Sequence, residues 1–268
     1  MYGIFHRLKR LWKTKSFLWA FIKRDLKLRY AGSLLGIFWS ILNPILLILL
    51  YIFVFSVILR VKLPASSRME NYNLFLLGGL IPWFYFQDAV LRASQSFIDL
   101  SNFIKKLPIP LIICPLTYCF SSLPIFFTGS FILAAYATFL GFSVKIFLLL
   151  LPLYIIFLLL FAFFLSVIFA FIVVYFRDFT QILSLLLTIF LFLTPIFYSP
   201  NMVPEKLQPF LLLNPLYAYL KSFRASLAGG NLSIIFKDLL IPFCYLSFLA
   251  ILAFIFYKRL APAIRDDL

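Results

Sequence analysis

Small polar side chains recur along one side of two long apolar stretches of this chain. Their steps of three and four residues would place them on one face of a helix. Such a stripe needs either a tightly packed protein neighbour or a watery cavity beside it. Helix packing explains either stripe alone. Two stripes on separate helices favour a shared polar seam, along which a molecule could pass without covalent chemistry. The first comprises Ser33, Gly36, Ser40, Asn43, Leu47 and Tyr51, and the second Thr180, Ser184, Thr188, Leu191, Pro195 and Tyr198.

The chain offers few residues for covalent or redox chemistry. His6 is the only histidine and stands beside basic residues, which is typical of a solvated position rather than a metal ligand. Cys114, Cys119 and Cys244 lie inside apolar runs without a Cys-x-x-Cys pair, so they predict neither a redox centre nor a disulfide framework. We therefore expect no catalytic residues, no metal site and no cofactor bound by this chain.

Charged residues within the apolar runs are equally sparse. Asp88 is the main one, and Arg92 follows one helical turn later, so the two can form an i,i+4 ion pair. Carboxylates deep inside the runs are missing, which argues against an ion-driven carrier and against a membrane enzyme with an acid pair. The sequence also has no G-x-x-x-x-G-K-[ST] run, so any nucleotide-driven work needs ATP and Mg on a separate subunit.

The high hydrophobic content of the chain indicates that these apolar stretches lie in a membrane. Of 268 residues, 64% are hydrophobic and 12% charged, with 36 Phe, 14 Tyr and a net charge of +15. A soluble domain averages about 45–50% apolar and about 25% charged residues. We expect an all-α integral membrane protein whose residues 33–268 form six transmembrane helices. The uncharged runs predict spans at about 34–59, 74–95, 111–140, 146–175, 179–198 and 239–257.

The region before the last span is broken by Pro209, Asn214-Pro215 and Gly229-Gly230. Its apolar pieces are too short to cross about 30 Å of hydrocarbon. We expect two short re-entrant or gate helices at about 205–236. With six spans both termini lie on one side, and that side carries sixteen of the 24 basic residues. Because positive charge marks the cytoplasmic side, we expect both termini to be cytoplasmic.

Residues 1–32 have the pattern of an amphipathic helix lying in the cytoplasmic membrane interface. Apolar residues follow helical steps on either side of an expected break at Thr14–Ser16, and basic residues take the opposite face. The segment lacks a short apolar core and a cleavage site, so it is not a signal peptide. The apolar face comprises Phe5, Leu8, Trp12, Leu18, Phe21, Ile22 and Leu26.

The link at about 97–108 predicts a short helix that ends at Pro108. Phe103 and Ile104 precede Lys105 and Lys106, a pattern that would present a small amphipathic knob to a soluble partner. A plain basic connector is the alternative interpretation.

Three ordered stretches resemble the membrane subunits of type-2 ABC exporters, in the branch that moves polysaccharides such as O-antigen, capsule and teichoic acid. The first runs from Arg24 to Tyr30 and on through Asn43-Pro44, and the second from Ile81 to Pro108. The third joins Tyr175-Phe176-Arg177-Asp178 to Thr194-Pro195-Ile196-Phe197-Tyr198, Asn214-Pro215 and Arg224. Each stretch is weak alone, and their order and spacing make the resemblance specific.

The resemblance implies a homodimer in the bacterial inner membrane, paired with two copies of an ATPase and exporting a lipid-linked polysaccharide. It assigns coupling to the ATPase to Arg24, Phe103, Ile104, Lys105, Lys106, Arg177 and Asp178. It assigns the external gate to Asn214, Pro215 and Arg224. Aromatic residues near the two seams, with polar residues of the seams themselves, would guide the sugar. This gives a pathway of Tyr30, Phe38, Trp39, Ser40, Asn43, Tyr51, Thr188, Phe192, Phe197 and Tyr198. Membrane lipids are further partners, and nucleic acid is not one.

Three alternatives stay open. The nearest is an ABC permease for a drug, a lipid or another small amphiphile, which gene neighbours would distinguish. A membrane acyl- or glycosyltransferase would need buried histidines or acids, and the chain does not offer them. A passive channel would purify without an ATPase.

Overall fold

All regular structure in the described part of the chain is helical. The computed structural model describes residues 2–63, 71–107 and 109–264. The expected all-α class is confirmed for these residues. Pro108, the expected end of the link helix, lies outside them. The side chains of residues 1–14 also lie outside the description, and with them the predicted faces of Phe5, Leu8 and Trp12.

The long helices are α1 (Tyr2–Arg29), α2 (Trp39–Ile52), α3 (Tyr72–Ser94), α7 (Leu123–Phe139), α8 (Lys145–Tyr175), α9 (Phe179–Leu193) and α12 (Leu232–Leu260). Shorter ones are α4 (Ser96–Asp99), α5 (Ser101–Lys106), α6 (Ile113–Ser121), α10 (Gln208–Leu212) and α11 (Pro215–Leu227). A π-helix at Phe53–Ile58 extends α2, and 3₁₀ turns form at Gly36–Phe38 and Pro200–Met202. Helix α1 is continuous, so the expected break at Thr14–Ser16 is wrong.

Four helical segments are long and apolar enough to cross a membrane: α3, α6 together with α7, α8, and α12. Two others, Leu42–Ile58 and Phe179–Leu193, are apolar but shorter. The third segment is divided at Ser122, the residue between α6 and α7, with Pro124 in the first turn of α7. These segments support a multi-pass membrane protein, in line with the composition.

The first apolar run starts as an elbow rather than as a helix. Gly32 and Gly36 have φ values of +78° and +52°, a left-handed backbone that glycine adopts without steric cost. Helix α2 therefore begins at Trp39, later than the expected start near residue 34. Ser33 and Gly36 lie in the elbow, so the first polar stripe does not occupy a single helix face.

The fifth apolar run also ends early as a helix. Thr194 is extended, with φ −87° and ψ 131°, because the ring of Pro195 disfavours helical backbone at the preceding residue. Helix α9 stops at Leu193, and residues 194–198 leave it as irregular chain. The second stripe consequently loses Pro195 and Tyr198 from its helix face.

The segment expected to hold two gate helices at about 205–236 contains α10 and α11, and then the start of α12. Gly229 has φ +68°, which ends α11, and the Asn231 side chain accepts a hydrogen bond from the Ser233 amide to begin α12. Residues 232–236 thus belong to the last long helix. Its expected start at residue 239 is seven residues too late.

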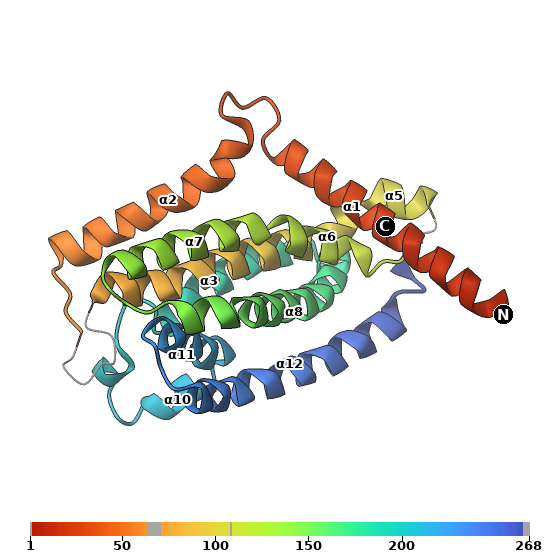
Figure 1. Ribbon diagram of the computed structural model, residues 1–268. Coiled ribbons are helices and arrows are strands. Elements are labelled where there is room, and N and C mark those ends of the chain that lie inside the picture. The colour runs from red at the N-terminus through yellow and green to blue at the C-terminus, as the bar shows by residue number, and fades with distance from the viewer. Residues whose placement is uncertain (1, 64–70, 108, 265–268) are drawn as a thin grey trace.

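Helix α3 forms the centre of the bundle. Leu74, Leu80 and Ala89 are among its fully buried residues, and α8, α7, α6 and α11 all pack against it. Helix α2 lies along the outside of α7 (Figure 1). Helices α1 and α5 and the C-terminal end of α12 lie at one end of the bundle, called here the terminal end. Helices α10 and α11 lie at the other, called the α11 end.

Candidate functional site

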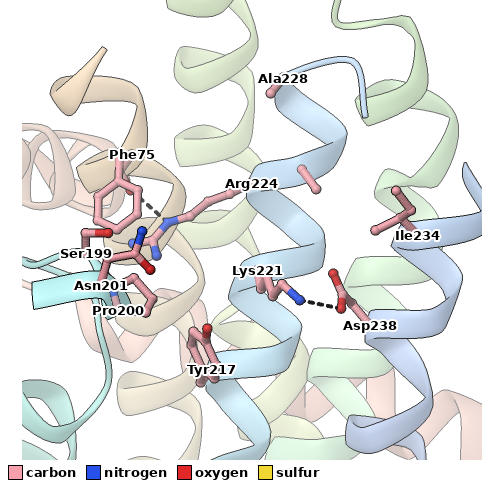
Figure 2. Close-up of a pocket in the computed structure, with 11 residues that line it drawn as sticks. Phe75, Ser199, Pro200, Asn201, Tyr217, Lys221, Arg224, Ala228, Ile234 and Asp238 are labelled. Atoms are coloured by element: carbon pink, nitrogen blue, oxygen red, sulfur yellow. Dashed lines mark hydrogen bonds and ion pairs between the residues drawn. The ribbon is translucent and has the colours of Figure 1, made fainter. Parts of the chain in front are cut away.

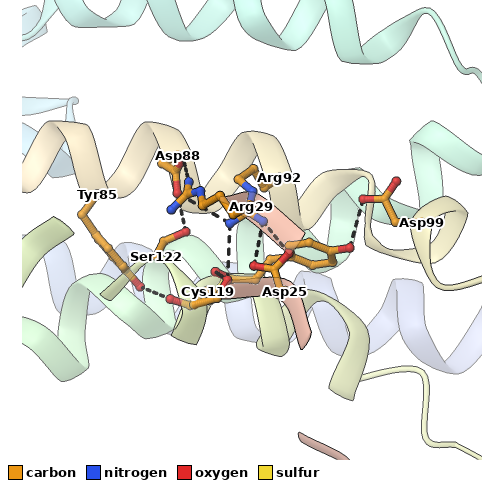
Figure 3. A network of polar contacts seen from close by, with 10 residues as sticks. Asp25, Arg29, Tyr85, Asp88, Arg92, Asp99, Cys119 and Ser122 are labelled. Carbon is orange, nitrogen blue, oxygen red and sulfur yellow. Dashed lines mark hydrogen bonds and ion pairs between the residues drawn. The ribbon is translucent and has the colours of Figure 1, made fainter. Parts of the chain in front are cut away.

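Four charged side chains join α1 to α3 at the terminal end (Figure 3). Arg92 donates to both carboxylate oxygens of Asp25, with its Nη2 at 2.5 and 2.7 Å, and Arg29 pairs with Asp88. Each helix supplies an acid and a base one turn apart, and the helices pass in opposite directions, so unlike charges meet. We call these four residues the α1–α3 clasp.

The expected Asp88–Arg92 pair is the weakest contact within this clasp. Arg92 Nη1 lies 4.0 Å from Asp88 Oδ2, whereas each residue has a closer partner on α1. The i,i+4 spacing correctly placed the two side chains together on one helix. Their main partners, Asp25 and Arg29, come from a helix about sixty residues earlier, which spacing within α3 does not reveal.

The end of α6 completes the surroundings of the clasp. The Ser122 hydroxyl donates to Asp88 Oδ2 at 2.5 Å, and the Arg92 guanidinium lies 5.0 Å from the ring centre of Tyr118. The four clasp side chains are between 13% and 23% exposed. Partial burial lowers the effective dielectric, so the attraction between these charges is less screened than on an open surface, although burial also costs desolvation free energy.

Helix α5 packs against α1 through an aromatic contact. The rings of Phe21 and Phe103 meet edge to face with centroids 5.3 Å apart, and the Arg24 guanidinium lies 4.7 Å from the Phe103 ring centre. Aromatic and cation–π contacts of this kind each contribute roughly 0.5–1.5 kcal/mol. The structure thus brings together Arg24 and Phe103, two of the expected coupling residues.

The remaining coupling residues lie at the same end but differ in exposure. Ile104 is buried, whereas Lys105 and Lys106 are exposed, so α5 has the amphipathic character that its sequence indicates. Arg177 and Asp178 are exposed in the turn between α8 and α9. A soluble partner could therefore reach all of these polar side chains at the terminal end.

Four of the expected pathway residues line one hollow of about 400 Å³ beside the clasp. The elbow between α1 and α2 forms it, with the α3 residue Asp88 and the α7 residue Ile125 as the facing wall. Phe38 is 68% exposed and is not among the lining residues, so its place in the expected group is not supported by this hollow. The other residues around it are Arg29, Tyr30, Ser33, Trp39, Ser40, Asn43 and Pro44.

Other pathway residues form an aromatic cluster toward the α11 end. Phe197 is its buried centre, with its ring centroid 5.4 Å from Tyr51, 5.6 Å from Phe192 and 4.8 Å from Phe55. Tyr51 also lies 6.2 Å from Phe84 on α3. Phe55 and Phe84 were not expected as part of this group. No sequence pattern distinguishes these two residues, because phenylalanine is abundant along every predicted span.

Two expected pathway residues bond to their own segment. The exposed Thr188 hydroxyl donates to the Ser184 carbonyl at 3.0 Å, one turn back on α9. The Tyr198 hydroxyl donates to the Phe192 carbonyl at 3.1 Å, which folds residues 194–198 back over the end of α9. Tyr198 is thereby joined to Phe192 of the aromatic cluster, and neither Tyr198 nor Thr188 lines the elbow hollow. The expected pathway thus does not form one continuous group.

Asn214 and Pro215 begin α11 and attach it to the end of α9. The Asn214 side-chain Oδ1 accepts from the Leu216 and Tyr217 amides at 3.0 and 3.3 Å, as a helix N-cap does. Its Nδ2 donates to Thr194 Oγ1 at 2.8 Å. Pro215 occupies the first helical position, where its missing N–H costs nothing.

Arg224 connects α11 to two other segments at this end, a connection that we call the Arg224 tie. It donates to the backbone carbonyls of Phe75, Pro195 and Ile196 at 3.0, 2.9 and 3.2 Å, and its guanidinium lies 3.6 Å from the Phe75 ring centre. The residue is 6% exposed, and among the described residues no carboxylate forms an ion pair with it. Burial lowers the pKa of Arg224 to about 9, so the guanidinium keeps its charge at neutral pH.

A glycine pair on α3 makes room for this arginine. A Cβ at Gly79 would lie 2.5 Å from Arg224 Nη2, and one at Gly78 would lie 3.0 Å from Arg224 Cγ. The side chain therefore crosses α3 where the helix has no side chains of its own. This combination of Gly78-Gly79 with a distant arginine was missed, since only the fold brings the two together.

Comparison with known proteins relates the sequence of this chain to transporters. Residues 16–228 match the family described as ABC-2 type transporter. Two relatives from Klebsiella pneumoniae, each named O-antigen export system permease protein RfbA, are 32% and 33% identical over 217 and 211 residues. Each match covers 78% of this chain and 79% of the relative. A Myxococcus xanthus protein of the same name is 30% identical over 224 residues, covering 81% of this chain and 82% of that protein.

Proposed function

This chain belongs to the ABC-2 type transporter family, and we propose that it is the membrane subunit of an ATP-driven exporter of a lipid-linked polysaccharide. The observation that carries the proposal is that relatives named O-antigen export permeases match 78–81% of the chain. The chain itself is a transporter subunit rather than an enzyme. The sequence offers no phosphate-binding loop, so ATP and Mg belong to a separate ATPase subunit.

We propose that two copies of this chain pair with two copies of that ATPase at the terminal end. Exposed Lys105 and Lys106 on α5 and the exposed turn at Arg177-Asp178 offer polar contacts to a soluble partner. Through Phe21 and Phe103, a push on α5 would reach α1. Through the clasp, a movement of α1 would reach α3.

Helix α3 then connects the two ends of the molecule. It spans 23 residues, or about 35 Å at 1.5 Å per residue. Asp88 and Arg92 near its C-terminal end belong to the clasp, whereas Gly78 and Gly79 near its N-terminal end receive Arg224. We propose that α3 carries movement at the ATPase side to α11, and that α10 and α11 gate the far end.

For the polymer, the elbow hollow and the aromatic cluster are the proposed contact groups. The elbow hollow combines Trp39 and Tyr30 with the polar Ser40 and Asn43. Sugar rings can stack on aromatic faces while their hydroxyls bond to polar side chains. The clustered rings around Phe197 would continue this surface toward the α11 end.

The proposed topology has six membrane crossings in the inner membrane, with both termini in the cytoplasm. The four long apolar segments, the two shorter ones and the basic residues near the termini support it. In a cysteine-free background, a cysteine at Asn201 should react with an impermeant reagent added outside, and one at Thr14 should not. The reverse pattern would invert the topology.

Deletion of the gene in its own host tests the function. We expect loss of a surface polysaccharide and accumulation of its lipid-linked form inside, both restored by the wild-type gene. Normal amounts of every surface polysaccharide in the deletion strain would refute the proposal. A drug-sensitivity change alone would point instead to a small-amphiphile exporter.

A further inference from the structure

A groove of about 290 Å³ runs along α11 at the end of the bundle opposite the clasp (Figure 2). Its floor is one face of α11, which contributes Tyr217, Lys221, Arg224, Ala225 and Ala228 at helical steps. This size is at the small end of ligand pockets, which suits a sugar ring better than a lipid chain. The walls are Phe75 of α3 with Ser199, Pro200 and Asn201 on one side, and Ile234 and Asp238 of α12 on the other.

An ion pair crosses this groove from α11 to α12. Lys221 Nζ donates to Asp238 Oδ1 at 2.7 Å, and the Lys221 side chain is 54% exposed. The bond uses one of the three ammonium donors of the lysine. Asp238 Oδ2 is buried, and in the described part of the chain it has no hydrogen-bond partner. The Lys221 ammonium therefore keeps two donors at the groove, and Asp238 Oδ1 can accept a second hydrogen bond beside the one from Lys221, whereas Oδ2 is covered by the protein.

The charges of the groove favour a neutral ligand. Lys221 and Asp238 offset each other, and the Arg224 N–H groups are directed at the carbonyls of Phe75, Pro195 and Ile196. Arg224 also lines the groove and has no carboxylate partner among the described residues, but three of its five N–H groups are already donated to those carbonyls. An anion would therefore meet the Asp238 carboxylate beside an arginine whose hydrogen bonds are largely used. A hydrocarbon chain would have to cover the ion pair, which costs desolvation free energy.

Apolar surface lies directly beside these polar groups. Ala225 and Ala228 of the floor and Ile234 of the α12 wall give an apolar surface, and Tyr217 adds a half-buried aromatic ring. A pyranose ring has the matching character, with C–H faces for the apolar surface and hydroxyls that both donate and accept hydrogen bonds. The groove therefore offers what a sugar requires on each side of its ring.

We infer that this groove binds a neutral sugar residue, with Lys221 and Asp238 bonding its hydroxyls and Tyr217 contacting its ring. Resting on the proposed function, the inference makes the groove a contact for the polymer at the α11 end. It is separate from the elbow hollow and from the aromatic cluster, which share no lining residue with it.

Saturation-transfer NMR on the full chain, purified with its ATPase, tests this binding. The probes are the methyl glycosides of glucose, galactose, mannose, rhamnose and N-acetylglucosamine. We expect at least one glycoside to bind the wild type. Lys221→Met combined with Asp238→Leu should raise its dissociation constant about tenfold or more, the effect of losing one charge-assisted hydrogen bond. Lys237→Met, an exposed change next to Asp238 and outside the groove, should leave it unchanged.

A second variant separates a true loss of binding from misfolding of the double variant. Ala225→Leu fills the floor without removing a polar group, and it should also weaken binding while the protein elutes as the wild type does. Failure of every glycoside to bind the wild type would overturn the inference. So would equal binding by the wild type, the double variant and Ala225→Leu.

Export measured in the same strains separates this inference from the proposed function. If the gene is required for surface polysaccharide but no glycoside binds, only the groove inference fails. If surface polysaccharide is normal without the gene, the proposed function fails. Groove-dependent glycoside binding in that case would show a sugar site in a protein with another role.

Discussion

Arginines connect helices at both ends of this molecule, but their partners differ. In the α1–α3 clasp, Arg29 and Arg92 meet carboxylates and are 17% and 23% exposed. In the Arg224 tie, a 6% exposed arginine meets only backbone carbonyls and the Phe75 ring. Ion pairs that water can reach are able to exchange partners, whereas three directed bonds from a nearly buried side chain are not easily replaced. The clasp is therefore suited to move during each cycle, and the tie to fix the segments that it joins.

The largest effect should follow loss of the tie. Arg224→Leu leaves the carbonyls of Phe75, Pro195 and Ile196 without their side-chain donor, so the free energy of unfolding should fall by about 3 kcal/mol or more. Thermal unfolding of the purified protein in detergent measures this loss. Lys237→Leu, an exposed change on α12, is the control and should unfold as the wild type does. An unchanged unfolding temperature for Arg224→Leu would contradict a fixed tie.

A smaller effect should follow from crowding the same site. Gly79→Ala places a methyl group 2.5 Å from Arg224 Nη2 and 3.0 Å from Ile196 Cγ2, and overpacking of this kind costs about 1–3 kcal/mol. The cost should shrink when Arg224→Leu is present, because the crowded group is then gone. Unfolding of both single variants and the double variant measures this coupling. Strictly additive losses of unfolding free energy would show that position 79 is not coupled to Arg224.

The clasp should respond more weakly and in a reversible way. Asp25→Arg replaces an attraction to Arg92 with a repulsion, and should lower the free energy of unfolding by about 1–2 kcal/mol. Adding Arg92→Asp reverses the pair and should restore most of the loss, because an acid on α3 would then face a base on α1 at the same two positions. Unfolding and ATP hydrolysis of the complex are the measurements. A reversed pair that is less stable than either single variant would refute the clasp as a simple charge match.

The smallest effect on stability is expected at α5. Lys105→Glu with Lys106→Glu alters two exposed residues, so the free energy of unfolding should change by no more than about 0.5 kcal/mol. Association with the ATPase should nevertheless weaken, because the reversed charges would face it. Co-purification of the two subunits measures this effect. Full recovery of the complex would remove α5 as the docking helix.

The two ends also differ in what the sequence could predict. The long run of α8 was expected at 146–175 and found at Lys145–Tyr175, since no charged residue interrupts it after Lys145. Arg224 was placed at the α11 end, but its partners are backbone carbonyls, which any residue carries and no motif marks. The clasp combines two i,i+4 pairs, of which only Asp88–Arg92 lies within an apolar run. Which charged residue of α1 meets which charged residue of α3 depends on how the two helices cross, and side-chain spacing does not specify that crossing.

ATP-driven transport by the purified complex tests the central claim most directly. The chain and its ATPase would be placed in vesicles with the lipid-linked polysaccharide from the host, and protection of the sugar from an added glycosidase would be measured. We predict that ATP moves the sugar across the membrane, and that Asp25→Arg slows this movement while the reversed pair recovers it. Movement without ATP, or ATP hydrolysis with no transfer of polysaccharide, would contradict the account.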